Sequence, residues 1–197
     1  MAGWTGIIEN GGRIMKTCYV FLADGFEEIE ALTVVDLLRR DNIPVETVSI
    51  DNKEYVDGSH KIRVKADCKL SDVNPANACL LVLPGGMPGT ENLYNNETLQ
   101  KMLLDFHATN RRIAAICAAP SILGRLGILK GKKAVCYPGR EEQLEGATVL
   151  KEEVVTDGNI TTSRGMGTAI AFGLELVKLL DCETEAGALK NKIIYRQ

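Results

Sequence analysis

The sequence has 197 residues, of which 45% are hydrophobic, and its formal net charge is -3. A single α/β domain can use this whole length, and the apolar content is sufficient for a buried core. Because there is no long basic run and no apolar run of membrane-spanning length, neither nucleic acid nor a membrane is an expected partner.

The six cysteines stand singly along the sequence, without the paired C-x-x-C spacing of a zinc site or a dithiol redox motif. We therefore expect no metal site, and we expect free thiols in a reducing compartment, the cytoplasm. The spacings of Rossmann and Walker nucleotide sites are absent. Residues 1–14 lack the apolar segment of a secretory signal. They are predicted to be a disordered extension before a single domain at residues 15–197.

The first strand is predicted at residues 17–23, which are almost continuously apolar. A helix is predicted from Glu27 onward. Its apolar residues recur at helical spacing: Ala31, Val34, Val35 and Leu38. Glu27 and Glu30 lie one turn earlier on the same inward face. Acidic residues in the first turn of a helix can instead only complement the helix dipole, and for Glu27 and Glu28 we favour this interpretation. Glu30 lies deepest and is the predicted functional carboxylate.

Strands and helices alternate along the rest of the chain, which predicts an α/β fold with a mostly parallel sheet. Further strands are predicted at residues 43–50, 78–83, 113–116 and 133–136, hairpins at 54–64 and 153–162, and helices at 168–180 and 184–190. A helix between two strands has an apolar stripe at Leu99, Met102, Leu103 and Phe106. The loop 84–89 contains Gly85 and Gly86, whose N–H groups could line an anion pocket.

A single cysteine, Cys117, follows the apolar run 113–116 and precedes a helix-like pattern that begins at Pro120. This arrangement predicts a nucleophile elbow, in which the N–H groups of the new helix point at the sulfur and favour the thiolate. The alternative is a small buried apolar residue that closes a strand. The local pattern does not decide between the two.

Ligands of doubly wound sheets bind beyond the carboxyl ends of the strands, where Cys117 and the glycine loop are expected to meet. Gly86 and Ala118 are predicted to supply oxyanion-hole N–H groups. A shielded Glu30 keeps a raised pKa and can exchange protons near neutral pH. The two histidines, His60 and His107, are expected at the surface, so a histidine-based cysteine protease is not indicated.

Four motifs stand in the order and spacing of the ThiJ/PfpI superfamily, and the sequence resembles its branch of protein deglycases and bacterial ThiJ-like proteins. The motifs are Ala23–Glu30, Leu83–Gly86, Ala114–Pro120 and Thr162–Gly165. The resemblance implies a flavodoxin-like three-layer sandwich, usually a homodimer, that works without a cofactor. It also implies that Cys117 is the reactive cysteine and Glu30 its partner.

The sequence departs from the pattern of this branch at two positions. Tyr137 stands where human-like members have a histidine near the cysteine, and Met166 stands where they have a proline. Ala118 occupies the position of the histidine in the protease branch, which argues against peptidase activity. We assign Gly85, Tyr137 and Arg164 to substrate binding.

The leading functional prediction is a glyoxalase or deglycase acting in stress protection. Its expected substrate is a small carbonyl compound of the methylglyoxal type or a glycated adduct, which Cys117 attacks while Glu30 moves the proton. The alternative is a redox-sensing thiol protein or chaperone in which Cys117 is oxidised. Self-association through the first predicted helix and nearby strands would fit the homodimer that the resemblance implies.

Overall fold

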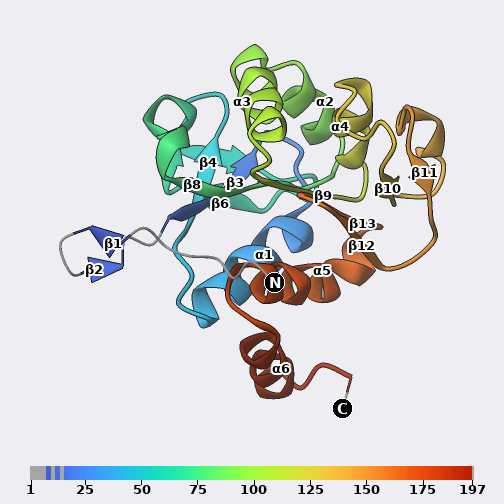
Figure 1. The fold of residues 1–197 in the computed structure, drawn as a ribbon. Helices are drawn as coiled ribbons and strands as arrows, with labels where there is room; N and C mark the ends of the chain where they lie inside the picture. Colours follow the sequence, from blue (N-terminus) through green and yellow to red (C-terminus); the bar gives the residue numbers. More distant parts are fainter. Residues whose placement is uncertain (1–7, 10–11, 14–15, 197) are drawn as a thin grey trace.

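The computed structural model describes residues 8–9, 12–13 and 16–196 (Figure 1). The extension predicted at residues 1–14 lies outside the described residues except for Ile8–Glu9 (β1) and Gly12–Arg13 (β2), which pair as antiparallel strands. None of the described helices has the length and apolar character needed to cross a membrane.

A seven-stranded sheet forms the centre of the molecule, in the order β12-β13-β9-β8-β3-β4-β7. All neighbouring strands are parallel except β12 and β13, which form a hairpin. The strands are β3 (Thr17–Leu22), β4 (Val45–Ser49), β7 (Cys68–Lys69), β8 (Ala78–Leu83), β9 (Arg112–Ile116), β12 (Val154–Asp157) and β13 (Ile160–Ser163). The prediction of a mostly parallel sheet is confirmed.

Helices cover both faces of this sheet (Figure 1). One face carries α1 (Glu28–Arg40), α5 (Ala169–Leu180) and α6 (Glu183–Lys192), and the other carries α2 (Gly89–Tyr94), α3 (Glu97–Ala108) and α4 (Pro120–Arg125). Because side chains alternate along a strand, Val20 of β3 packs in the first core and Phe21 in the second. The molecule is therefore the predicted three-layer α/β sandwich.

The two apolar helix stripes lie where the sequence pattern places them. All four stripe residues of α1 are buried against β3 and α5, and all four of α3 are buried on the opposite face. These amphipathic faces explain why helices form here, since each can bury its apolar stripe only against the sheet.

Several short elements differ from the predictions. The strand predicted at residues 133–136 is shorter, and β10 (Lys133–Ala134) pairs with β11 (Thr148–Val149) in a separate sheet. The first predicted hairpin is confirmed as β5 (Tyr55–Asp57) and β6 (Arg63–Lys65), which form a sheet of their own. Short 3-10 helices lie at Leu70–Asp72 (η1), Pro75–Asn77 (η2), Glu141–Gln143 (η3) and Met166–Thr168 (η4).

Candidate active site

Cys117 lies at the turn between β9 and α4, as predicted, with a left-handed backbone φ of 65°. A residue other than glycine rarely adopts this conformation, and it occurs here as it does in nucleophile elbows. Two backbone hydrogen bonds hold the turn: Cys117 N–H donates to Ser163 O at 3.0 Å, and Tyr137 N–H donates to Cys117 O at 2.7 Å. The surrounding strands therefore fix the direction of the sulfur.

The glycine loop after β8 lies directly against this turn. A Cβ atom on Gly85 would lie 2.7 Å from both Cys117 Cβ and Glu30 Oε2. Gly86 follows with φ 90°. Only glycine at position 85 allows the loop to approach both side chains this closely.

Glu30, in the first turn of α1, points inward as predicted and is 1% exposed. Gly85 N–H donates to its Oε2 at 2.8 Å. Burial raises the pKa of the Glu30 carboxyl to about 7, against the lowering effect of hydrogen bonds with Cys117 and Gly85. Near neutral pH this group therefore exchanges its proton readily.

The N–H groups of Ala118 and Gly86, the predicted oxyanion-hole donors, both hydrogen-bond the Cys117 sulfur and lower its pKa. Burial and the negative charge of Glu30 outweigh them and raise the pKa of Cys117 to about 12. The prediction that the turn favours the thiolate is therefore wrong. The helix that follows, α4, has only six residues, and its N-terminus cannot offset a buried carboxylate.

The ionised Glu30 disfavours ionisation of Cys117, because two negative charges cannot be buried side by side at low cost. When Glu30 is protonated, its negative charge no longer raises the pKa of the Cys117 thiol. The protonated carboxyl can then donate a hydrogen bond to the sulfur. With the pKa of Glu30 at about 7 and that of Cys117 at about 12, the negative charge of the pair lies on Glu30.

Tyr137 and Arg164, both assigned to substrate binding, make different contacts. A Cβ atom on Gly165 would lie 3.4 Å from Tyr137 Cδ2 and 4.0 Å from Cys117 Sγ, so the half-exposed Tyr137 ring flanks the sulfur. The Arg164 guanidinium instead lies 3.5 Å from Lys151 O, in a cavity of about 190 Å³ beside Cys136. No described contact brings Arg164 to Cys117.

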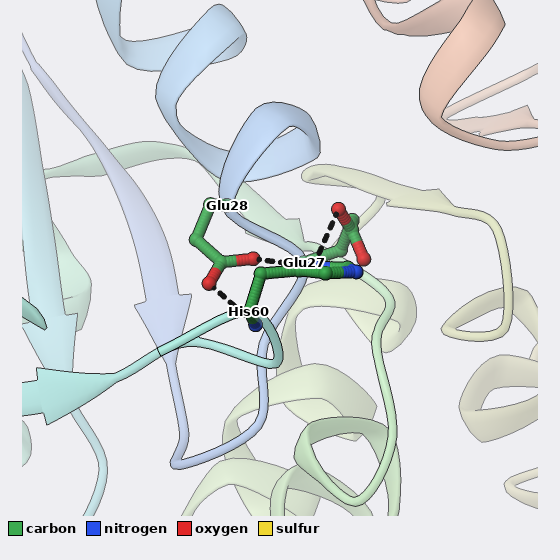
Figure 2. Close-up of side chains that lie close together, drawn as sticks. All are labelled: Glu27, Glu28 and His60. Carbon is green, nitrogen blue, oxygen red and sulfur yellow. Dashed lines mark hydrogen bonds and ion pairs between the residues drawn. The ribbon is translucent and has the colours of Figure 1, made fainter. Parts of the chain in front are cut away.

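Sequence reasoning missed a cluster formed by Glu27, Glu28 and His60 (Figure 2). Glu28, attributed above to the helix dipole, has its carboxylate buried and accepts from His60 N–H at 2.7 Å. The His60 ring Nδ1 lies 3.1 Å from Glu28 Oε2 and 3.5 Å from Glu27 Oε1. The hydrogen bond with Glu28 raises the pKa of His60, which is exposed as predicted.

In the part of the chain that the structure describes, this cluster is the one group of side chains close enough together to hold a metal ion. Burial acts against ionisation of Glu28, but backbone and His60 hydrogen bonds hold the pKa of Glu28 below its ordinary value. Its oxygens are thus already satisfied within the protein. The sequence does not reveal this cluster, because its formation depends on the 54–64 hairpin folding back onto the start of α1.

Comparison with known proteins places these motifs in a family. The profile of the DJ-1/PfpI family matches residues 16–179. The chain belongs to the DJ-1/PfpI family. The match covers all four motifs named above, and this confirms the resemblance on which the Cys117 and Glu30 assignments depend.

Individual relatives agree with this membership. Protein DJ-1 homolog B of Arabidopsis thaliana is 39% identical over 183 residues, covering 92% of this chain and 42% of the relative. The Parkinson disease protein 7 homolog of Danio rerio is 33% identical over 185 residues, covering 92% of this chain and 98% of the relative. The chain thus spans less than half the length of the Arabidopsis relative.

Solved structures of DJ-1 proteins have the same fold. Oxidized DJ-1 of Toxoplasma gondii has a TM-score of 0.88 and 34% identity, covering 92% of this chain and 100% of that chain. DJ-1beta of Drosophila melanogaster has a TM-score of 0.87 and 31% identity, and the match covers 92% of this chain and 99% of that chain. The flavodoxin-like fold implied by the DJ-1/PfpI resemblance is confirmed.

Proposed function

We propose that this DJ-1/PfpI protein is a cofactor-free, cysteine-dependent stress-protection enzyme with glyoxalase or deglycase activity. Its substrates would be α-oxoaldehydes of the methylglyoxal type or their adducts. The observation that carries the proposal is the Cys117 thiol in an elbow turn, beside a glutamate whose pKa is near 7 and within reach of two N–H donors. The stress-protection role of the DJ-1/PfpI family supports the same function.

The first step joins the sulfur to the aldehyde carbon. As Cys117 Sγ attacks, its proton passes to the Glu30 carboxylate, so a free thiolate with a pKa of about 12 need not accumulate. The carbonyl oxygen gains the negative charge, and the N–H groups of Gly86 and Ala118 lie where they can stabilise it. Protonation of that oxygen by Glu30 gives a hemithioacetal and restores the carboxylate.

The second step moves a hydrogen between the two carbons of the substrate. Glu30 removes the proton from the former aldehyde carbon and returns a proton to the neighbouring ketone carbon through an enediol. The aldehyde carbon is oxidised to a thioester and the ketone is reduced to an alcohol. Water then cleaves the thioester, releasing the hydroxy acid and the Cys117 thiol, so no external oxidant or reductant is needed.

The test compares methylglyoxal turnover by the wild-type protein, Cys117→Ser and Glu30→Gln. Both variants should lose turnover, and kcat/KM of the wild type should rise as the pH increases through about 7, because Glu30 must be ionised to accept a proton. Cys182→Ser, which changes an exposed cysteine at the start of α6, is the matched control and should keep full turnover. Undiminished turnover by Cys117→Ser would exclude the mechanism.

The second candidate function is a redox sensor or chaperone in which Cys117 is oxidised to the sulfinate. Two observations favour it: N–H groups already surround the sulfur, and a protonated Glu30 could donate a hydrogen bond to a sulfinate oxygen. A structural relative, Toxoplasma gondii DJ-1, is described as oxidized. Peptide mapping after peroxide treatment tests this role, and oxidation spread evenly over the six cysteines would count against it.

We also propose that the protein acts in the cytoplasm as a homodimer, with a second copy on the outer face of α1. Exposed isoleucines line a groove of about 560 Å³ there: Ile29, Ile62 and Ile170. An apolar patch that matches itself through a two-fold axis is typical of dimers. Light scattering should give a dimer for the wild type and a monomer for Ile29→Glu. Leu104→Glu, at an exposed position of α3, should remain dimeric.

A further inference from the structure

Two other cysteines, Cys18 and Cys79, have their sulfur atoms 3.4 Å apart. Cys18 is the second residue of β3 and Cys79 the second residue of β8, and these strands are neighbours in the middle of the sheet. Cys79 Sγ also lies 3.4 Å from Lys16 O. Among the residues that the structure describes, no other two thiols share a hydrogen bond.

An irregularity in the pairing of β3 with β8 brings the two thiols together. Thr17 pairs with Ala78, but Cys18 pairs with Leu80, so Cys79 is an additional residue on its strand. Such a bulge redirects a side chain and recurs near functional positions. Here both cysteines pack in the core on the α1 side of the sheet.

The two thiols differ in exposure and in charge environment. Cys18 is completely buried, whereas Cys79 is 8% exposed. The hydrogen bond with Cys18 and the charges of Lys16 and Arg112 lower the pKa of Cys79 against the effect of burial. The same hydrogen bond, together with burial, raises the pKa of Cys18. Cys79 is the more exposed thiol and lies near two positive charges, so we take Cys79 as the member that reacts first and Cys18 as the resolving thiol.

We propose that Cys18 and Cys79 form a second thiol site, which reduces hydroperoxides and is converted to a disulfide. The Cys79 thiolate attacks the terminal peroxide oxygen, the O–O bond breaks, and the alcohol or water leaves after taking up a proton. Cys79 is then a sulfenic acid. The Cys18 thiol attacks this sulfur, forming the S–S bond and releasing water. Two thiols lose two electrons and two protons, and the peroxide gains them.

The geometry permits this reaction without the Cys117 site. A disulfide has an S–S bond of about 2.05 Å, so rotation of the two side chains must bring the sulfurs closer by roughly 1.4 Å. The pair lies at the amino ends of the strands, whereas Cys117 lies at the carboxyl end of its own. Leu83, at the other end of β8, lies four residues beyond Cys79, about 13 Å at roughly 3.3 Å per residue. The proposal therefore depends on neither reaction proposed for Cys117.

The experiment uses the full chain with Cys117→Ser, which removes the first site. The folded protein is treated with hydrogen peroxide, its remaining thiols are alkylated, and it is digested without a reducing agent for mass spectrometry. We expect a linked pair of peptides containing Cys18 and Cys79, lighter by two hydrogen atoms than the reduced pair and separated by dithiothreitol. Adding Cys182→Ser as a control should leave the link unchanged.

A second variant identifies which thiol reacts first. With Cys18→Ala added, the linked peptides should disappear and dimedone should label Cys79, because its sulfenic acid lacks a resolving thiol. Cys18→Val serves the same purpose if the alanine variant does not fold. The proposal is overturned if Cys18 and Cys79 remain fully alkylated after peroxide treatment. It is also overturned if the link forms only in urea that unfolds the chain.

Discussion

Replacing Glu30 with glutamine should make the protein more stable at alkaline pH, although it removes a residue that we place in the active site. Glutamine has nearly the same shape and retains an acceptor for the N–H group of Gly85. It cannot ionise, so it avoids the cost of a buried negative charge. The prediction therefore isolates the effect of that charge on the free energy of unfolding.

The magnitude follows from the pKa of Glu30, which rises from an ordinary value of 4.5 to about 7 in the folded protein. The folded state holds this proton more tightly than the unfolded state, so stability falls as the pH rises through this interval. At about 1.4 kcal/mol per pH unit, the full loss is about 3–4 kcal/mol. Between pH 5 and pH 8, Glu30→Gln should gain about 2–3 kcal/mol relative to the wild type.

Urea unfolding at several pH values, followed by circular dichroism, measures this difference. A gain of this size is a large fraction of the roughly 5–15 kcal/mol that stabilises a typical domain. Glu142→Gln, at an exposed glutamate, is the control and should follow the wild type at every pH. If the free energy of unfolding depends on pH in the same way for the wild type and for Glu30→Gln, burial does not raise the pKa of Glu30 as described above.

Three further measurements test the site and the core. Gly85→Ala should lower the free energy of unfolding by about 1–3 kcal/mol and slow methylglyoxal turnover at least tenfold, because the new Cβ would lie 2.7 Å from Cys117 Cβ and from Glu30 Oε2. The control is Gly167→Ala, whose new Cβ would have no atom within 4 Å, and it should change neither quantity. Alkylation of Cys117 by iodoacetamide should still accelerate above about pH 9, whereas a plateau below about pH 8 would indicate a thiolate of low pKa. Phe172→Ala should lower the free energy of unfolding by about 3–5 kcal/mol in a urea titration, since this ring is fully buried.

The positions of Cys117 and Glu30 could be predicted because local patterns determine them. An apolar strand followed by Pro120 fixes where the turn occurs, and the spacing from Ala31 and Val34 back to Glu30 fixes the direction of the carboxylate. Both inferences need only the periodicity of a strand or a helix. The layers of the fold follow from the same periodicity, since each apolar stripe requires a face of the sheet.

Other features depend on contacts between distant segments and could not be predicted in this way. The burial of Glu28 results from the 54–64 hairpin folding over the start of α1, where His60 N–H reaches the carboxylate. The contact between Cys18 and Cys79 depends on a bulge in the strand pairing, which no local pattern indicates. The two-residue strand β7 is too short to show any periodicity.

The direction of the Cys117 pKa was mispredicted because two opposing effects had to be weighed quantitatively. The N–H groups were correctly expected at the sulfur, but burial and Glu30 act more strongly in the other direction. The protonation state of Glu30 links the two candidate functions of the site.

Above about pH 7, Glu30 is ionised and can take the proton from Cys117 while the sulfur attacks a carbonyl carbon. Below that pH, Glu30 is protonated and can donate a hydrogen bond to an oxidised sulfur. One carboxyl group would thus favour carbonyl turnover on the alkaline side of its pKa and stabilisation of a sulfinate on the acidic side.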